Sequence, residues 1–297
     1  MVDPVIREFS DASRRNWSPG CAAGTPRPVR TYLWEPSSPP ALGPPPLLLM
    51  SHGTGGSARD LAWLAEALAH AGFLVAGVDH HGNNWVDEYL PEGFAFTWER
   101  PRDLGFVLEQ LRAERALGPV GAAGFSLGGY TAAATVGARI DPERYRAVAQ
   151  GLVPMPPLPE FPDLLEALNA RYTAEQREAA VAQCGADCSV PAVEAAFLIC
   201  PGIGPLIDQE SLAAVARPVS IRWGGADDNS PGLGNALYYA EHIPGAQVIC
   251  VGEDVGHYLF VDGSESGESA RRRVAADAVT FFRHQLSHAA LGSDRAR

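Results

Sequence analysis

The chain of 297 residues contains no lysine, and all 23 of its basic residues are arginine. A catalytic Schiff base on a lysine amine and a Walker-type phosphate loop are therefore both excluded. The formal net charge of −12 leaves no basic stripe that could offset the repulsion from nucleic-acid phosphates. The chain is thus not expected to bind nucleic acid or to carry out lysine-dependent chemistry.

Long hydrophobic runs are missing as well. No apolar stretch approaches the roughly 18 residues of a membrane-spanning helix, and the N-terminal segment MVDPVIREFSD lacks the apolar core of a signal peptide. Hydrophobic residues still make up 46% of the chain and charged residues 20%, as in a globular protein with a sizeable core. We expect one cytoplasmic domain over residues 1–297, without a membrane span.

Cysteine is scarce, with five residues in the chain. Cys200 and Cys250 stand in apolar, strand-like runs and are expected to be buried thiols. Cys184 and Cys188 lie close together in a polar stretch. They could form a small disulfide or half of a metal site, although no nearby histidine completes such a site. No metal or organic cofactor is expected.

From residue 47 onward, apolar runs alternate with segments of helical pattern. The apolar runs cover residues 46–50, 73–81, 120–125, 193–202, 218–225 and 246–252, and the helical segments cover 58–72, 101–117, 234–243 and 268–286. Before them, only residues 27–36 are expected to form a strand. Continuous apolar strands that alternate with helices predict an α/β fold, with a mainly parallel sheet covered by helices on both faces.

Residues 141–192 interrupt this alternation. The segment LVPMPPLPEFP, residues 152–162, is too rich in proline to be a central strand. Two short helical patterns follow at residues 163–172 and 173–184, and Thr173 and Gln176 have the spacing of a capping box. We interpret residues 141–192 as a helical insertion that could cover a pocket as a cap.

Ser126 lies between glycines in the sequence GFSLG, directly after an apolar run and directly before a helical one. A sharp strand-to-helix turn strains the serine backbone, and side chains two positions away would collide, so Gly124 and Gly128 are required there. The turn lifts the hydroxyl clear of the sheet and places the Leu127 amide at the positive end of a helix. This pattern predicts that Ser126 is a nucleophile.

A serine nucleophile needs a base, and the base needs an orienting carboxylate. On a sheet of this type, the acid and the base should follow the serine in that order, each after a strand. Asp227 follows the run 218–225, and His257 follows the run 246–252. Asp228 is the rival acid, but Gly224, Asp227 and Pro231 fit the usual Gly-x-x-Asp-x-x-x-Pro turn.

The sequence SHGTGG, residues 51–56, is the expected oxyanion loop, because small residues let backbone amides approach a substrate. We assign the oxyanion donors as the amides of Thr54 and Leu127, with Gly53 as an alternative to Thr54. His52 is expected to brace this loop rather than to act as a base. His52 and Gly53 are also candidates for substrate contact.

The first strand after this loop ends in two histidines, His80 and His81, at the edge where such folds place a pocket. His80 is a candidate for pocket lining or loop hydrogen bonding. The loop that follows carries four aromatic residues, which could form either an apolar wall or ordinary core: Trp85, Phe94, Phe96 and Trp98. Of these, Trp98 is the candidate for substrate contact.

Six segments together resemble the α/β-hydrolase superfamily: SHGTGG, VDHHGN, WERPRDLGFVLEQL, GFSLGGYTAAATVGARI, GGADDNSP and GHYLF. More closely, they resemble its predicted dienelactone-hydrolase branch, which is akin to the platelet-activating-factor acetylhydrolases. The resemblance runs from about residue 29 to 287. It implies a serine carboxylesterase with a triad of Ser126, Asp227 and His257. True dienelactone hydrolases use a cysteine nucleophile, so the resemblance does not carry over dienelactone as the substrate.

The expected function is therefore cleavage of a small-molecule carboxylic ester through an acyl-enzyme intermediate. An amidase, a thioesterase or a cyclising acyltransferase of a biosynthetic pathway would use the same triad. A catalytically dead hydrolase fold that serves as a binding module is the alternative of a different class.

Overall fold

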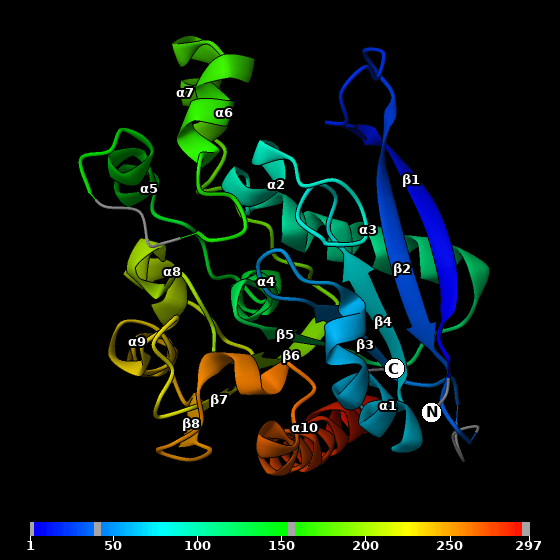
Figure 1. The fold of residues 1–297 in the computed structure, drawn as a ribbon. Coiled ribbons are helices and arrows are strands. Elements are labelled where there is room, and N and C mark those ends of the chain that lie inside the picture. Colours follow the sequence, from blue (N-terminus) through cyan, green and yellow to red (C-terminus); the bar gives the residue numbers. More distant parts are fainter. Residues whose placement is uncertain (1–2, 39–42, 154–157, 293–297) are drawn as a thin grey trace.

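The computed structural model describes residues 3–38, 43–153 and 158–292, and its centre is a sheet of eight strands (Figure 1). The strand order is β1-β2-β4-β3-β5-β6-β7-β8. The strands are β1 (Val5–Arg15), β2 (Pro26–Trp34), β3 (Leu47–Ser51), β4 (Leu74–Asp79), β5 (Val120–Phe125), β6 (Val193–Ile199), β7 (Val219–Trp223) and β8 (Gln247–Cys250). Strands β3 to β8 run parallel, whereas β1 and β2 pair antiparallel at one edge. The predicted, mainly parallel sheet is confirmed.

Strand β1 was not predicted from the sequence. Most of its residues are exposed or half-buried, and Phe9 is its single buried apolar residue. Because the strand lies at an edge and is largely solvent-facing, its sequence carries no apolar run. It pairs with β2 from Val5 opposite Leu33 to Arg15 opposite Pro26.

Helices cover both faces of the sheet. The helices are α1 (Ala62–His70), α2 (Pro91–Ala95), α3 (Glu99–Glu114), α4 (Leu127–Thr135), α5 (Pro142–Ala149), α6 (Leu164–Arg171), α7 (Ala174–Val181), α8 (Gln209–Ala213), α9 (Ala236–His242) and α10 (Glu265–Gly292). Short 3-10 turns are η1 (Ala58–Leu61), η2 (Gly204–Leu206), η3 (Gly232–Gly234) and η4 (His257–Phe260).

The strands divide their side chains between two apolar clusters. In β3, Leu47 and Leu49 join the cluster beneath α3, α4 and α9, whereas Leu48 and Met50 join the cluster beneath α1 and α10. This alternation follows from the two-residue period of a strand. Both faces of the central strands are therefore buried, which explains their continuous apolar sequences.

Three helices, α5 to α7, stand between α4 and β6, in place of a simple crossover (Figure 1). The predicted helical segments 163–172 and 173–184 form α6 and α7, and α7 begins with the predicted capping box of Thr173 and Gln176. Helix α5 was not predicted. Residues 154–157, in the proline-dense segment 152–162, lie outside the described residues.

Helix α6 is held against α2 by an apolar contact and a polar anchor. Leu164 and Leu168 pack with Phe94 of α2. The buried carboxylate of Glu92 accepts hydrogen bonds from Arg171 Nε at 2.8 Å and from the Tyr172 hydroxyl at 2.6 Å. The insertion is therefore joined to the body of the molecule by specific contacts.

The cysteine predictions are settled within the described residues. Cys184 and Cys188 are free and buried in the core, so they form no disulfide with each other. Cys200 is buried as predicted, but Cys250 is partly exposed because β8 is an edge strand.

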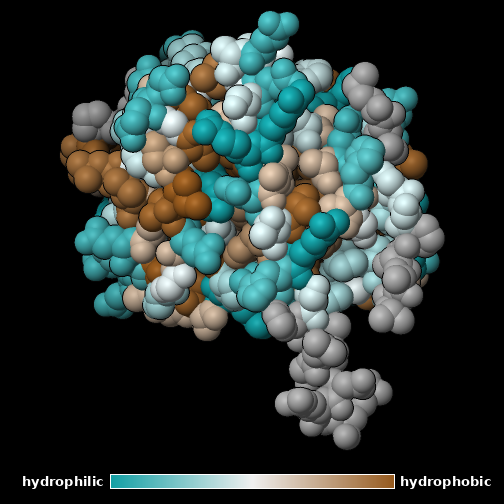
Figure 2. Space-filling model, turned by 90° about the horizontal axis from the view of Figure 1, so that it is seen from below, coloured by the Kyte–Doolittle hydropathy of each residue, from teal (hydrophilic) through white to brown (hydrophobic). Residues whose placement is uncertain are grey.

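Apolar side chains on the surface gather in separate patches among hydrophilic ones on the face seen in Figure 2. The most exposed large hydrophobic residues in the described part of the chain are Leu233, at 85%, and Leu152, at 74%. None of the helices described is both long enough and apolar enough to cross a membrane.

Replacement of Phe282 by alanine tests how α10 is packed. Phe282 is fully buried and its ring contacts Phe73, Phe197 and Phe281. We expect the free energy of unfolding in urea to fall by about 3–5 kcal/mol, because the cavity cannot close fully. The control Thr280→Ala, on the exposed side of α10, should change it by less than about 0.5 kcal/mol. Equal effects of the two substitutions would contradict this packing.

Candidate functional site

Ser126 lies in the sharp turn between β5 and α4, with a backbone φ of 56°. This left-handed conformation is strained for a residue with a side chain. A Cβ atom at Gly124 would lie 1.9 Å from the carbonyl oxygen of Gly128, and one at Gly128 would lie 2.0 Å from that of Ser51. The two flanking glycines are therefore required by close backbone approach, as the sequence predicted.

Three side chains meet at this turn although they are far apart in the sequence. His257 Nε2 lies 3.0 Å from Ser126 Oγ, and His257 Nδ1 lies 2.7 Å from Asp227 Oδ2. Ser126 is 6% exposed, Asp227 5% and His257 3%, so the chain of hydrogen bonds is shielded from most water. This arrangement can pass a proton from the hydroxyl to the imidazole while the carboxylate fixes the ring.

Asp227, and not its neighbour Asp228, faces the histidine. The second oxygen of Asp227 accepts a hydrogen bond from the Ser230 amide at 2.7 Å, which fixes the carboxylate in the turn after β7. Asp228 is exposed. The turn predicted from Gly224, Asp227 and Pro231 thus places Asp227, and not Asp228, beside His257.

Cys200 completes a group with Asp227 and His257 whose potential ligand atoms lie within 4.8 Å of one another. A metal would need to stand between the ligand atoms, about 3.3 Å apart in a tetrahedral zinc site. The 2.7 Å contact between Asp227 and His257 is instead a direct hydrogen bond. Burial, and then the Asp227 carboxylate, raise the pKa of Cys200 well above its usual value, which disfavours the thiolate that a metal needs. The geometry fits a triad better than a metal centre.

The loop after β3 lies against the serine. A Cβ atom at Gly53 would lie 3.3 Å from Ser126 Cβ. Thr54 makes no hydrogen bond to any residue that the structure describes. Leu127 is the first residue of α4, where an amide has no acceptor in its own helix. Within the part of the chain that the structure describes, the amides of Thr54 and Leu127 are therefore free to donate hydrogen bonds to a ligand, and each belongs to a segment that lies against or follows Ser126.

His52 is fully buried and braces the loop from within. Its Nδ1 donates to the carbonyl oxygen of Gly53 at 2.6 Å, and its Nε2 accepts from the His80 amide at 3.2 Å. Both backbone partners have fixed roles, so the ring is the neutral Nδ1–H tautomer. Burial, together with Arg100 and His80, lowers the pKa of His52 well below its usual value. The side chain bonds within and beside the loop and has no exposed surface, so the structure does not favour His52 as a substrate contact.

His80 belongs to a buried polar network, not to a pocket surface. Its side chain is 1% exposed, with Nε2 at 2.9 Å from Ser51 Oγ and Nδ1 at 2.9 Å from Asp103 Oδ2. Burial, with Arg100, lowers the pKa of His80 to about 3. Although burial opposes it, the charges of Arg27 and Arg14 hold the pKa of Asp103 well below its usual value. Asp103 therefore stays ionised and His80 stays neutral.

Trp98 is also buried, at 2% exposure, in the core beneath α3 and α4. Phe94 packs on α6, which leaves it in the contact between α2 and the insertion. Trp85 is 48% exposed, and its ring nitrogen donates to the Asp60 carboxylate. The aromatic residues of this segment therefore form core and insertion contacts and not one continuous apolar wall.

Three residues of the site were not predicted from the sequence: Arg100, Asn83 and Asp103. For Arg100 and Asp103, the sequence pattern of α3 could have indicated a role. Arg100 and Asp103 occupy the same face of α3 as the buried Leu104 and Val107. Charged residues in line with an apolar face must be paired or hydrogen-bonded when buried, and therefore indicate a polar network.

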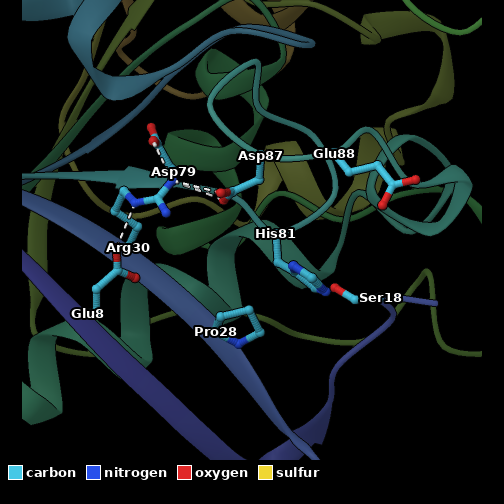
Figure 3. Close-up of a pocket in the computed structure, with 8 residues that line it drawn as sticks. All are labelled: Glu8, Ser18, Pro28, Arg30, Asp79, His81, Asp87 and Glu88. Carbon is cyan, nitrogen blue, oxygen red and sulfur yellow. Dashed lines mark hydrogen bonds and ion pairs between the residues drawn. The ribbon is translucent and has the colours of Figure 1, made fainter. Parts of the chain in front are cut away.

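A separate cavity of about 190 Å³ opens beside β2 and the end of β4 (Figure 3). Arg30 crosses it and pairs with Glu8 at 2.7 Å and with Asp87 at 3.0 Å, and it lies 4.0 Å from Asp79. No member of the Ser126 group lines this cavity. Its charged side chains are one arginine, Arg30, and four acidic residues, so the lining of the cavity is acidic overall.

Gly128→Ala tests the close approach beneath Ser126. We expect a loss of at least about 3 kcal/mol in the free energy of unfolding, together with lost reactivity of Ser126, because backbone atoms must move apart. The matched control is Gly105→Ala in α3, where the new Cβ would make an ordinary 3.4 Å contact with Val190. The free energy of unfolding of Gly105→Ala should rise by about 0.5–1 kcal/mol, because alanine favours a helix more than glycine does. Calorimetry of both variants compares the two, and a stable Gly128→Ala protein would contradict the geometry.

The buried His81 predicts a pH-dependent stability. Its Nε2 accepts a hydrogen bond from the Trp17 amide at 3.0 Å, and burial, with Arg27, lowers its pKa to about 4. Between pH 6.5 and 4, the His81 imidazole binds a proton in the unfolded chain but not in the folded chain. The free energy of unfolding therefore falls as the pH falls. At pH 5 this contribution amounts to about 2 kcal/mol. The free energy of unfolding of His81→Gln, measured in urea, should fall less steeply from pH 7 to pH 5 than that of the wild type. Equal slopes for the two proteins would contradict the lowered pKa of His81.

Comparisons with known proteins give similar structures but no similar sequence. No protein-family model matches the chain, and neither does any curated protein. Among solved structures, esterase 2 of Thermogutta terrifontis phosphorylated by paraoxon is 14% identical with a TM-score of 0.57, covering 94% of this chain and 93% of that one. Est1E from Butyrivibrio proteoclasticus is 12% identical with a TM-score of 0.52, covering 90% and 97%.

A puromycin-hydrolyzing peptidase of Mycobacterium tuberculosis is 14% identical with a TM-score of 0.57, and the match covers 95% of this chain and 39% of that one. At such identities the likeness concerns the fold. Together with the eight-stranded, mainly parallel sheet, it shows that this chain has the α/β-hydrolase fold.

Proposed function

We propose that the chain is a serine hydrolase that cleaves small carboxylic esters through an acyl-enzyme intermediate. The observation that carries the proposal is the continuous hydrogen-bond path from Ser126 through His257 to Asp227. The strained backbone of Ser126 supports it, because such strain is typical of functional residues. The motifs favour a place in the dienelactone-hydrolase-like branch, near the platelet-activating-factor acetylhydrolases.

In the proposed reaction, His257 Nε2 removes the proton of Ser126 Oγ as the oxygen attacks the ester carbonyl. The negative charge on the carbonyl oxygen is held by the amides of Thr54 and Leu127, each typically worth roughly 3 kcal/mol. His257 then protonates the leaving alcohol. Water attacks the acyl-enzyme by the same route and frees Ser126. Asp227 remains ionised and holds the imidazole in the required tautomer.

The leaving group is the part of the proposal that the triad does not fix. An ester, a thioester and an amide all pass through the same tetrahedral intermediate, and the choice lies in the shape of the pocket. One similar structure is a peptidase, so an amide substrate is the second candidate. A panel of matched ester, thioester and amide substrates separates these activities. The hydrogen bonds that join Ser126, His257 and Asp227 argue against a catalytically dead binding module, because such a module would not need the complete path.

Ser126→Ala tests the assignment directly. Turnover of p-nitrophenyl esters should fall at least about 10⁴-fold, because the acyl-enzyme can no longer form. A fluorophosphonate probe should label the wild-type protein at Ser126 and leave the variant unlabelled. Ser266→Ala, which removes an exposed serine of α10, serves as the control and should retain full activity. Labelled and active Ser126→Ala protein would refute the proposed nucleophile.

A further inference from the structure

Arg100, the second residue of α3, is 1% exposed and has no carboxylate partner among the described residues. Its guanidinium donates to uncharged oxygens. They are the His52 carbonyl oxygen, Ser51 Oγ at 3.2 Å, Asn83 Oδ1 at 3.2 Å and Thr131 Oγ1 at 3.2 Å. A buried cation without a counterion is costly, and an apolar residue would stabilise the fold better. The arrangement therefore calls for a reason other than stability.

The partners of Arg100 lie on both sides of the proposed oxyanion site. On the loop side, the guanidinium holds the His52 carbonyl, and Asn83 Oδ1 also accepts the Gly55 amide at 2.8 Å. The residues before and after Thr54 are thereby fixed, while the Thr54 amide has no acceptor in the described part of the chain.

On the helix side, Arg100 donates to Thr131 Oγ1, and this hydroxyl donates to the Leu127 carbonyl oxygen at 3.0 Å. The first turn of α4 is thus tied to the same guanidinium as the loop. One planar group with several fixed donors joins the segments that carry the two proposed amides. A lysine ammonium could not reach these oxygens in the same geometry.

We propose that Arg100 is a positioning residue that sets the spacing between the Thr54 and Leu127 amides. The inference rests on the proposed serine hydrolase function. Arg100 does not touch the substrate. It holds the two donors at the separation that an oxyanion needs. Its loss should therefore weaken binding of the tetrahedral state more than binding of the substrate.

The test compares Arg100→Gln and Arg100→Lys with the control Arg222→Met. Arg222, in β7, is also buried, but it pairs with Asp277 of α10 and lies on a strand that does not neighbour β3. For Arg100→Gln we expect kcat on a p-nitrophenyl ester to fall about 10²-fold or more, the effect of losing one oxyanion donor, with KM within threefold. Arg100→Lys should recover part of kcat. Arg222→Met should keep kcat within about threefold.

A second readout separates positioning from stability. Affinity for a boronic acid, which forms a tetrahedral adduct on an active serine, should fall in parallel with kcat in Arg100→Gln. The pH at which activity reaches half its maximum should not move, because His257 and Asp227 are untouched. Unchanged kcat and boronate affinity in Arg100→Gln would overturn the inference. An equal loss of kcat in Arg222→Met would overturn it as well.

Thr131→Val provides an independent test if Arg100 variants fail to fold. It removes one hydroxyl at constant volume and cuts the tie to Leu127. We expect kcat to fall about 10-fold with little change in KM; an unchanged kcat would again overturn the inference. A wild-type protein that neither turns over esters nor binds the boronate would instead reject the proposed function itself.

Discussion

The site depends on how closely three backbone segments approach one another at the carboxyl edge of the sheet. Gly124 at the end of β5 touches Gly128 in the first turn of α4, and Gly128 touches the Ser51 carbonyl after β3. Gly53 in turn lies against Ser126. No side chain fits between these segments, so the nucleophile and the oxyanion loop are positioned by main-chain contact. The loops that carry Asp227 and His257 then complete the site by bringing their side chains to Ser126.

Much of this arrangement could be predicted because it follows from local sequence. Apolar runs fixed the buried strands, and turns at their ends placed Ser126, Asp227 and His257 at one edge. Side-chain direction could not be predicted in the same way. His80 follows a buried strand as expected, yet its ring points into a polar network, and Trp98 points into the core. Strand β1 carried no apolar signal because it is an exposed edge strand.

The buried polar network behind the site depends on arginine, for which lysine is a poor substitute. Arg27 donates two hydrogen bonds, of 2.8 and 2.9 Å, to the Asp103 carboxylate, which also pairs with Arg14 at 2.8 Å. Planar guanidinium groups can share one carboxylate and still bond to neighbouring oxygens, whereas an ammonium acts as a point charge. Asp103 stays charged in the interior because each of its two carboxylate oxygens has two partners.

Trp17 contacts segments of the chain that are far apart in sequence and are therefore synthesised at different times. Its amide donates to His81, its carbonyl oxygen accepts from Arg171 at 2.7 Å, and Arg27 lies over its ring at 4.1 Å. During synthesis on a ribosome, the N-terminal hairpin, the end of β4 and α2 all emerge before α6. The insertion therefore docks onto a surface that earlier segments have already supplied, and it adds no unsatisfied strand edge while the chain is still growing.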